Sequence, residues 1–307
     1  MIRKILYSDI DFQKYNYCVE NAVQTIFFGT SHYLDTIITG KWEVLVFGDY
    51  QAVMPIPFVK KYGAKIVIMP MQTQQLGVFS QKDDSMINQL FLEFLNKNYL
   101  VYQYSFNSNN HFVASLSSKT NFLIFPNEYS NVKKNYSVHR RRNVRILDKL
   151  KDRITFDEEL DIQQSYDFVL KNNLGMTDSS NLKFLKNMEK LQKKGYLEIY
   201  NLSIDNLIAS QMFLVKGNKE CIMVGLINNK KYSQYNSSSI IIDQILQKYI
   251  PNYLFNFHGS SIPVIADFFS RFGAEKQRYA IVENTKIKMV LKFILSKIFN
   301  INDNSTN

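Results

Sequence analysis

The stretch Tyr136-Ser-Val-His-Arg-Arg-Arg-Asn-Val-Arg-Ile-Leu-Asp-Lys-Leu150 carries much of the positive charge of the chain. From Val132 to Lys151 there are eight Lys or Arg residues and one acid, a local charge of +7 in a chain of net charge +10. At roughly 100° per residue the apolar residues gather on one side, which predicts an amphipathic helix docked by that side. That side is formed by Val132, Tyr136, Asn143, Leu147 and Leu150.

Arginine dominates the centre of this stretch, with four Arg between Arg140 and Arg145. Guanidinium groups make planar, bidentate contacts with phosphates and carboxylates, so the predicted helix is a candidate anion-binding element. A solvated basic helix is the alternative. Asn143 lies within the apolar side and needs a hydrogen-bond partner if it is buried.

The composition is that of a globular protein with a substantial core, because 46% of the 307 residues are hydrophobic and 21% are charged. The length fits two domains or one large one. The positive charge favours a polyanionic partner, namely nucleic acid, a nucleotide-carrying substrate or an anionic membrane surface. Cys18 and Cys221 are too isolated to indicate a disulfide framework or a zinc site. Without a signal peptide or a long apolar run, we expect a cytoplasmic protein.

The first half of the chain predicts helices followed by a sheet. The two apolar runs around Gly48-Asp49 indicate a hairpin, whose second strand is expected to end at Pro55 and Pro57 because proline cannot donate to an interior ladder. The segment Pro70-Met-Gln-Thr-Gln-Gln-Leu-Gly77 is predicted to be a polar loop, either solvated or hydrogen-bonded to a substrate. A helix over 84–96 and strands over 100–106 and 121–125 follow.

The second half predicts the same order of elements. Helices over 162–171 and 180–193 precede three strands over 197–203, 207–216 and 220–227, which the turn residues between them make an antiparallel meander. A helix over 240–250, a strand over 254–257 and a helix closing at Gly273 complete this half.

A possible anion site lies where the third strand of the meander leads into the next helix. The segment Gln234-Tyr-Asn-Ser-Ser-Ser239 places small residues at a helix N-terminus, whose free backbone amides and partial positive charge suit a phosphate. The alternative is an ordinary serine N-cap.

Taken together, these elements resemble the acyl-CoA N-acyltransferase (GNAT) superfamily. They are more similar still to the doubled, FemAB-like aminoacyl and acyl transferases of bacterial cell-wall and surface-glycan synthesis. The resemblance covers nearly the whole chain. It rests on Phe27-Phe-Gly-Thr-Ser-His-Tyr-Leu34, the Trp42 hairpin, Pro55-Ile-Pro57, the segment 136–143, the meander, Phe255-Asn-Phe-His-Gly-Ser260 and Phe272-Gly273.

The resemblance implies an α+β fold of two tandem GNAT-like domains, each with a mixed, mostly antiparallel sheet flanked by helices. The expected domains are 1–130 and 131–285, the second beginning with the basic helix, followed by an amphipathic helix and tail over 286–307. It also implies an N-acyltransferase that uses no covalently bound cofactor and no metal. The donor is phosphorylated or nucleotide-linked, either acyl-CoA or an aminoacyl-tRNA, and the acceptor is an amine on a sugar or peptide.

Two departures from the family bear on the substrates. The superfamily's pyrophosphate loop typically reads Gln/Arg-x-x-Gly-x-Gly/Ala, whereas this chain has Gln234, Ser237 and Ser239 at that spacing. A Cβ narrows the approach of an anion to the backbone, which leaves a donor other than CoA open. The Tyr-Lys pair of FemAB-type peptidyltransferases is missing, which argues against a peptidoglycan-precursor acceptor.

The resemblance also implies roles for individual residues. His258, in place of an acid before Gly259-Ser260, is the candidate general base, with a structural histidine as the alternative. The donor phosphates would lie at Gln234, Ser237, Ser238 and Ser239, while Arg141 and Arg142 neutralise a nucleotide or lipid phosphate. The other expected substrate contacts are Gln74, Gln75, Tyr136, Asn143, Gly259 and Ser260.

Two further hypotheses follow from charge patterns. The basic helix and the many tyrosines are also consistent with a non-catalytic binding module for RNA or acidic glycan. Residues 286–299 place Ile287, Val290, Leu291, Ile294 and Ile298 on one side with lysines beside them. This pattern is typical of a helix on an anionic bilayer, here the inner face of the membrane, or of a helix packed on the protein's own core.

Overall fold

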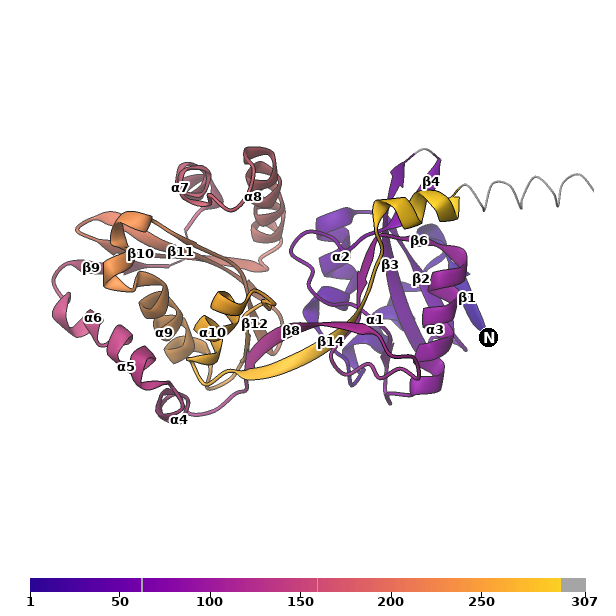
Figure 1. The fold of residues 1–307 in the computed structure, drawn as a ribbon, viewed down its shortest axis with the longest axis horizontal. Helices are drawn as coiled ribbons and strands as arrows, with labels where there is room; N and C mark the ends of the chain where they lie inside the picture. Colours follow the sequence, from indigo (N-terminus) through magenta and orange to yellow (C-terminus); the bar gives the residue numbers. More distant parts are fainter. Residues whose placement is uncertain (62, 159, 294–307) are drawn as a thin grey trace, which may run out of the picture. The chain divides into compact units, whose positions relative to one another are not determined.

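The computed structural model describes residues 1–61, 63–158 and 160–293. The chain forms two compact units (Figure 1). Unit 1 contains residues 1–119 and the described residues from Arg278 onward, and unit 2 contains Thr120–Gln277. These boundaries lie inside β8 (Ser117–Ile124) and β14 (Glu275–Glu283), whereas the sequence placed them at 130/131 and 285/286. Because each boundary lies within a continuous strand, no loop or linker residues indicate its position in the sequence.

Unit 1 is built on a mixed sheet of the order β1-β2-β3-β4-β6, with β5 also paired to β3. Among its described strands, β4 and β6 are the pair that runs parallel. Its strands are β1 (Ile2–Ile5), β2 (Trp42–Phe47), β3 (Ala52–Lys61), β4 (Ala64–Val67), β5 (Phe79–Ser80) and β6 (Leu100–Val101). A further strand, β7 (Gln103–Ser105), pairs with β14. Its helices are α1 (Phe12–Glu20), α2 (Ser31–Ile38), α3 (Ser85–Asn98) and the C-terminal helix, described over 286–293.

The prediction that Pro55 and Pro57 end the second strand of the hairpin is wrong, because β3 continues through both to Lys61. On the side away from β2, β3 pairs with β5 only at Ala52 and Val53 and with β4 only from Phe58 onward. The Pro55 carbonyl points to that side, where it accepts a hydrogen bond of 2.9 Å from the Tyr104 hydroxyl. The proline nitrogens therefore face a gap in the ladder, where no N–H donor is needed.

The glutamine-rich loop after β4 is largely buried rather than solvated. The Gln75 side chain is 2% exposed, and its Oε1 accepts a hydrogen bond of 2.9 Å from the backbone N–H of Ser108. Gln74 is half-buried and its Oε1 accepts from Gln75 Nε2 at 3.1 Å. Gln75 thus joins this loop to the loop at Ser108.

Unit 2 has a sheet of the order β8-β13-β12-β11-β10-β9, in which only β12 and β13 run parallel. The meander predicted for the second half is confirmed as β10 (Leu197–Ile204), β11 (Leu207–Lys216) and β12 (Glu220–Asn228). The remaining strands are β9 (Ile154–Asp157) and β13 (Leu254–Asn256), and the helices are α4 (Tyr129–Lys134), α5 (Val138–Val144), α6 (Ile146–Lys149), α7 (Tyr166–Asn172), α8 (Asp178–Lys193), α9 (Ser237–Tyr249) and α10 (Pro263–Ser270).

The two faces of the unit 2 sheet are covered by different helices (Figure 1). On one face Met212 and Leu214 belong to a core cluster that includes α9, α5 and α10 residues. Side chains alternate along a strand, so Phe213 points to the opposite face, where its ring lies 5.1 Å from that of Phe184 in α8. Helix α9 is buried over most of its length between the sheet and α5, and only Gln247 and Lys248 of this helix are exposed.

The basic stretch forms three short helices, α4, α5 and α6, instead of the single helix predicted. The break falls at Ser137, whose backbone is extended and whose Oγ accepts a hydrogen bond of 3.1 Å from Arg140 N, capping α5. The Tyr136 side chain is 2% exposed, and packing of its ring on Phe272 fixes the chain at this point. A local cap and a buried aromatic anchor thus override the continuous periodicity of the sequence.

Candidate functional site

The parallel strands β12 and β13 separate partway along their length. They pair only from Glu220↔Leu254 to Ile222↔Asn256, while β12 continues to Asn228. A register shift in β12 between its pairings with Phe213 and Leu214 accompanies the separation. Beyond Asn256 the chain stays with β8 instead, since Phe257 N donates to Phe122 O at 3.1 Å. Among the described residues no strand pairs with this edge of β12 beyond Ile222, so the edge suits an extended group that enters the fork.

Helix α9 begins just after β12, beside the end of the fork. Asn236 before the helix has a left-handed backbone (φ 55°), and the helical residues follow it directly. Successive left-handed and right-handed residues turn their backbone N–H groups into a concave, anion-binding arrangement. The first amides of a helix also have no acceptor within it, and the helix dipole adds partial positive charge. The backbone alone thus suits an anion here.

The serine side chains at this helix start point inward. The hydroxyl oxygens of Ser210 and Ser237 lie 2.7 Å apart, within hydrogen-bond distance, and both residues are buried. Asn228 Oδ1 accepts from Ser210 Oγ at 2.6 Å and from Ser238 Oγ at 2.8 Å, and Ser239 accepts from Arg140. The side chains of Ser237 and Ser239 therefore do not cover the outer side of the helix start. Although these serines replace glycines of the superfamily loop, they leave an anion room to approach the backbone amides.

Arg140 is the feature of this site that the sequence analysis missed. It is 1% exposed, and its guanidinium donates to Ser239 Oγ and, at 2.9 Å, to the Phe268 carbonyl. The guanidinium lies between two rings, with its carbon 4.1 Å from the centroid of Phe268 and 4.0 Å from that of Phe272. Burial, with the nearby charge of Arg271, lowers the pKa of Arg140 to about 10. Its Nε has no hydrogen-bond partner among the described residues.

A buried carboxylate supports the same helix one turn further on. Asp243 Oδ1 accepts hydrogen bonds from Tyr129 Oη at 2.8 Å and from Tyr136 Oη at 3.0 Å, and Lys133 Nζ lies 3.8 Å from Oδ2. Burial and the Asp243 charge raise the pKa of both tyrosines. Asp243 and Ser239 are four residues apart on α9, as are Tyr136 and Arg140 in the basic stretch, so two matched pairs join these segments.

The other arm of the fork ends at His258. His258 and Gly259 both have left-handed backbones (φ 60° and 76°), which turns the chain sharply after β13. Asn256 Oδ1 fixes this turn by accepting from His258 N at 2.9 Å and from Asn121 Nδ2 at 3.1 Å. The His258 side chain is half-buried. Ser260 Oγ accepts from Ile262 N at 3.0 Å, which prepares the start of α10.

The other residues predicted for the site are placed as follows. Gln234 is exposed on the segment before α9. Arg141 is half-buried and donates to the carbonyls of Lys134 at 3.1 Å and Tyr136 at 2.7 Å, so it closes the C-terminal end of α4. Arg142 is exposed and Asn143 is half-buried. Gln74 and Gln75 belong to unit 1, whereas every other predicted site residue belongs to unit 2.

A signal for Arg140 was present in the sequence. It lies four residues after Tyr136 and three before Asn143, so it belongs to the apolar side of the predicted helix. An arginine on the apolar side of a helix is rarely buried unless its guanidinium is paired, so this position indicated a specific partner. Within the described ranges no group of three His, Cys, Asp or Glu side chains could hold a metal ion.

No family model and no curated protein matches this sequence. Solved structures do match. FemX superposes with a TM-score of 0.60 at 9% identity over 90% of this chain and 96% of FemX. A conserved protein of unknown function from Bacteroides thetaiotaomicron VPI-5482 gives a TM-score of 0.55 at 10% identity, over 91% of this chain and all of the other. A tandem GNAT protein from the clavulanic acid biosynthesis pathway gives 0.50 at 10% identity, over 92% and 97%.

The chain has the FemAB-like, tandem GNAT fold. The predicted fold class is thereby confirmed, with helices flanking a mixed sheet in each unit. At such low identity the likeness of this chain to FemX concerns the fold and not the substrate. In the described part of the chain, no helix is both long and apolar enough to cross a bilayer.

Proposed function

We propose that this FemAB-like chain is an N-acyltransferase. It would move an acyl or aminoacyl group to an amine of a sugar or peptide acceptor in cell-envelope or surface-glycan synthesis. The observation that carries the proposal is the fork between β12 and β13 with the start of α9 beside it. The free edge of β12 suits an extended donor arm, and the backbone of the helix start suits its phosphates.

Arg140 strengthens the proposed phosphate position. A fully buried guanidinium, within described residues paired only to a hydroxyl and a carbonyl, adds a positive charge next to the first turn of α9. In such a low-dielectric place the charge acts on an anion more strongly than a solvated lysine would. The donor phosphate would thus meet the amides at Ser237 and Ser238 with Arg140 behind them, while Gln234, which is exposed, would contact its outer side.

The chemistry assigned to His258 is proton removal from the attacking amine. The amine nitrogen bonds to the donor's carbonyl carbon, and the bond from that carbon to the leaving sulfur or oxygen breaks. The histidine takes the amine proton, and the leaving group is protonated in turn. Its place at the end of β13, on the opposite arm of the fork from α9, is what supports this role. Gly259 and Ser260, which form the turn after it, would border the acceptor.

The donor is either acyl-CoA or an aminoacyl-tRNA. Since Arg141 already donates to two backbone carbonyls, contact with further phosphates falls to Arg142 and Arg145, which are exposed. Neither forms an ion pair with a carboxylate in the part of the chain that the structure describes. A long polyanion such as tRNA would use them, whereas the pantetheine arm of CoA needs only the fork.

A panel of donors and amines tests the proposal. Acyl-CoAs and aminoacyl-tRNAs are incubated with amino-sugars and peptides, and products are read by intact mass. We expect one donor class to raise the melting temperature and to give an acylated amine. His258→Ala should reduce kcat and remove the ionisation seen on the acid limb of the pH profile. His139→Ala, which changes an exposed histidine of α5, should behave as wild type. Turnover by His258→Ala with an unchanged pH profile would remove His258 as the base.

The exposed arginines also favour a second candidate, a non-catalytic module for RNA or acidic glycan. Such a module would bind a polyanion with an affinity that falls steeply as salt increases, and it would turn over no donor. A binding titration in graded salt separates the two functions when it is combined with the donor panel.

A further inference from the structure

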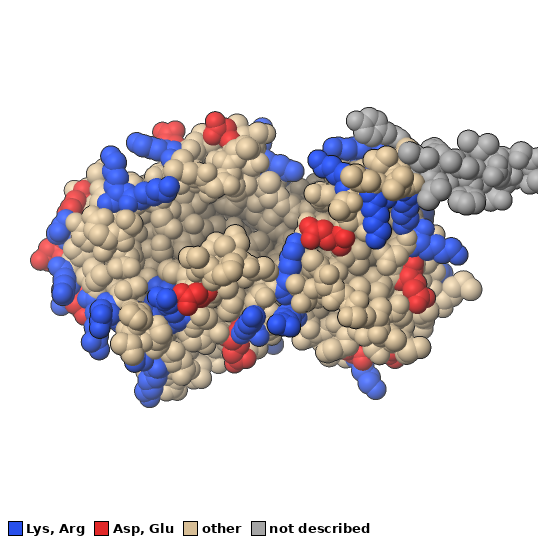
Figure 2. Space-filling view, in the orientation of Figure 1, with Lys and Arg blue, Asp and Glu red and all other residues tan. Residues whose placement is uncertain are grey.

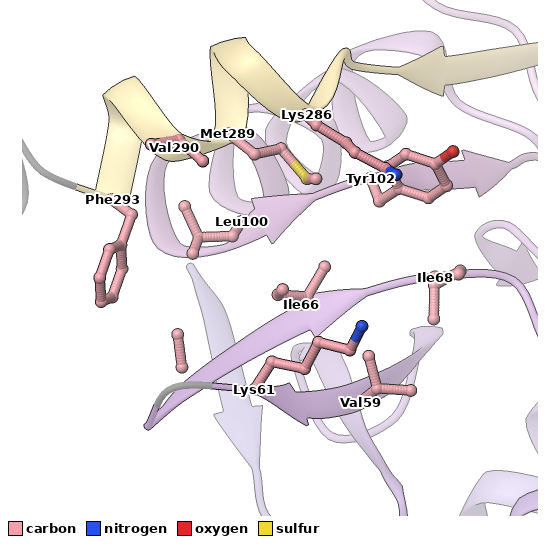
Figure 3. Close-up of a pocket in the computed structure, with 11 residues that line it drawn as sticks. Val59, Lys61, Ile66, Ile68, Leu100, Tyr102, Lys286, Met289, Val290 and Phe293 are labelled. Carbon is pink, nitrogen blue, oxygen red and sulfur yellow. The ribbon is translucent and has the colours of Figure 1, made fainter.

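Unit 1 contains an apolar cavity of about 410 Å³ under the C-terminal helix (Figure 3). The β3–β4 hairpin and the residue after it contribute Val59, Ile66 and Ile68, and the helix contributes Met289, Val290 and Phe293. Two lysines, Lys61 and Lys286, complete the lining. The cavity is thus a hydrocarbon-lined space with positive charge within reach of its wall. The transfer chemistry proposed above, which uses unit 2, has no need of it.

The helix over this cavity is fastened to unit 1. Thr285 caps it by accepting at Oγ1 a hydrogen bond of 3.2 Å from Lys288 N. Asn284 Nδ2 donates to the Val101 carbonyl at 2.9 Å, and Lys292 Nζ donates to the Tyr99 carbonyl at 2.7 Å. The cavity is therefore bounded by an anchored element and not by a loosely placed one.

The outer side of the same helix is apolar and open to solvent. Ile287 is 75% exposed and Val290 and Leu291 are each 56% exposed. Residues three and four apart lie on one side of a helix, so the three form a continuous patch. Burial in the protein's own core, the alternative considered from the sequence, does not hold for these three residues. Ile294 and Ile298 of the predicted apolar side lie outside the described residues. A helix that places its apolar residues outward beside an open apolar cavity has the character of an interfacial element.

Lysines surround this patch. Lys61, Lys286 and Lys288 are exposed, and within the described ranges none of them pairs with a carboxylate. The nearby acids are engaged elsewhere, Glu43 with Lys65 and Glu283 with Lys119. Figure 2 shows Lys and Arg side chains gathered around the C-terminal helix. Uncompensated lysines next to exposed aliphatic side chains match the headgroups and chains of anionic lipids.

We propose that this face of unit 1 binds an anionic lipid bilayer, with one acyl chain of a lipid entering the cavity. Ile287, Val290 and Leu291 would enter the interfacial layer, and Lys61, Lys286 and Lys288 would contact the lipid phosphates. The acyl chain would lie among Ile66, Leu100 and Met289. The protein would then work at a membrane surface without spanning it. No bond is made or broken, so binding is reversible.

Vesicle sedimentation tests the surface. The full chain should bind vesicles of equal parts phosphatidylglycerol and phosphatidylcholine, and should bind pure phosphatidylcholine far less. Lys61→Glu combined with Lys286→Glu should weaken binding by about thirty-fold or more. Each lysine near an anionic surface contributes roughly 1 kcal/mol, and each new glutamate adds repulsion. Lys183→Glu with Lys186→Glu, at exposed positions of α8, is the control of equal charge change. Equal loss in the control, equal binding to both vesicles or no binding at all would overturn the proposal.

The apolar contacts are tested by Ile287→Asn with Leu291→Asn, which should also abolish binding while leaving the melting temperature unchanged, because both side chains are exposed. Retained binding would contradict the proposal.

The cavity is tested with cis-parinaric acid, a fluorescent fatty acid whose emission rises in an apolar site. The full chain should bind it, and anionic vesicles should displace it. Ala64→Phe, at a lining position of β4, should weaken this binding about ten-fold or more by filling the space. Failure of the wild type to bind the probe, or equal binding by a folded Ala64→Phe, would refute chain entry. So would strong binding only in a chain that ends at Phe293, since residues 294–307 would then be the natural occupant.

Discussion

Replacing Arg140 by methionine should leave stability nearly unchanged while removing donor binding. The lowering of its pKa from 12.5 to about 10 by burial and by Arg271 corresponds to roughly 3 kcal/mol against the charged side chain at neutral pH. Methionine removes that cost and keeps most of the volume of the side chain between Phe268 and Phe272. Because the buried charge of Arg140 lowers the free energy of unfolding, we expect this residue to be required for function.

The interactions that Arg140→Met removes stabilise the fold by a free energy similar in size to this cost of burying the charge. The Ser239 hydroxyl and the Phe268 carbonyl lose a donor, at about 1 to 3 kcal/mol together. The two ring contacts contribute roughly 1 to 2 kcal/mol. The free energy of unfolding of Arg140→Met should therefore stay within about 2 kcal/mol of wild type. Arg140→Ala also empties the space between the rings and should be about 3 kcal/mol less stable than Arg140→Met.

The assay is urea unfolding followed by circular dichroism, together with donor binding by calorimetry for each variant. Because the folded-state pKa of Arg140 lies below the unfolded one, wild type should gain stability relative to Arg140→Met as the pH rises above about 10. A loss of about 5 kcal/mol or more in Arg140→Met would show that the buried charge is a net stabiliser. Donor binding equal to wild type would show that Arg140 serves no substrate.

Three further changes test the account of unit 2. Asp243→Asn should lower the free energy of unfolding by about 1 to 3 kcal/mol, because two buried tyrosine hydroxyls lose a charged acceptor; a melting temperature equal to wild type would contradict this. Gly273→Ala should destabilise by about 2 kcal/mol or more, since its φ is +72° and a Cβ would lie 2.6 Å from Asn135 Cβ; unfolding at the wild-type urea concentration would argue against that geometry. Burial opposes ionisation of Glu198, but hydrogen bonds from Tyr200, Tyr249 and Lys216 outweigh it and lower its pKa. The stability it contributes should thus be present above its ordinary pKa of 4.5 and be lost as the pH falls through the lower folded value, and Glu198→Gln should flatten the acid side of the stability profile.

Much of the fold could be predicted because its signals are local. The meander β10–β12 follows from alternating strands with turn residues between them, and the left-handed position of Gly273 follows from its place at a helix end. The extent of β3 could not be predicted, since whether a proline is tolerated depends on a gap in the ladder made by distant strands. The three-part basic segment depends likewise on tertiary anchoring of Tyr136.

Local sequence signals predicted the two chain segments that border the candidate site, but not the contacts that Arg140 makes beside them. The start of α9 and the turn at His258 follow from serine and glycine positions in the sequence. The pairing of Arg140 with Ser239 and of Tyr136 with Asp243 joins residues about a hundred positions apart, as the separations of 99 and 107 show. No periodicity within one segment reveals such contacts. Arg141 and Arg142 were predicted as phosphate contacts because they lie in an arginine-rich stretch. The buried guanidinium beside α9 belongs instead to the neighbouring Arg140.

Hydrogen–deuterium exchange with the donor panel tests the central claim most directly. If the fork and the start of α9 hold the donor, acyl-CoA or aminoacyl-tRNA should slow exchange in the outer part of β12, residues 223–228, and in the first turn of α9. Arg140→Met should abolish that protection. If no donor of either class protects these amides, or if protection appears only elsewhere in the chain, the site lies in another place and the proposed transfer reaction loses its basis.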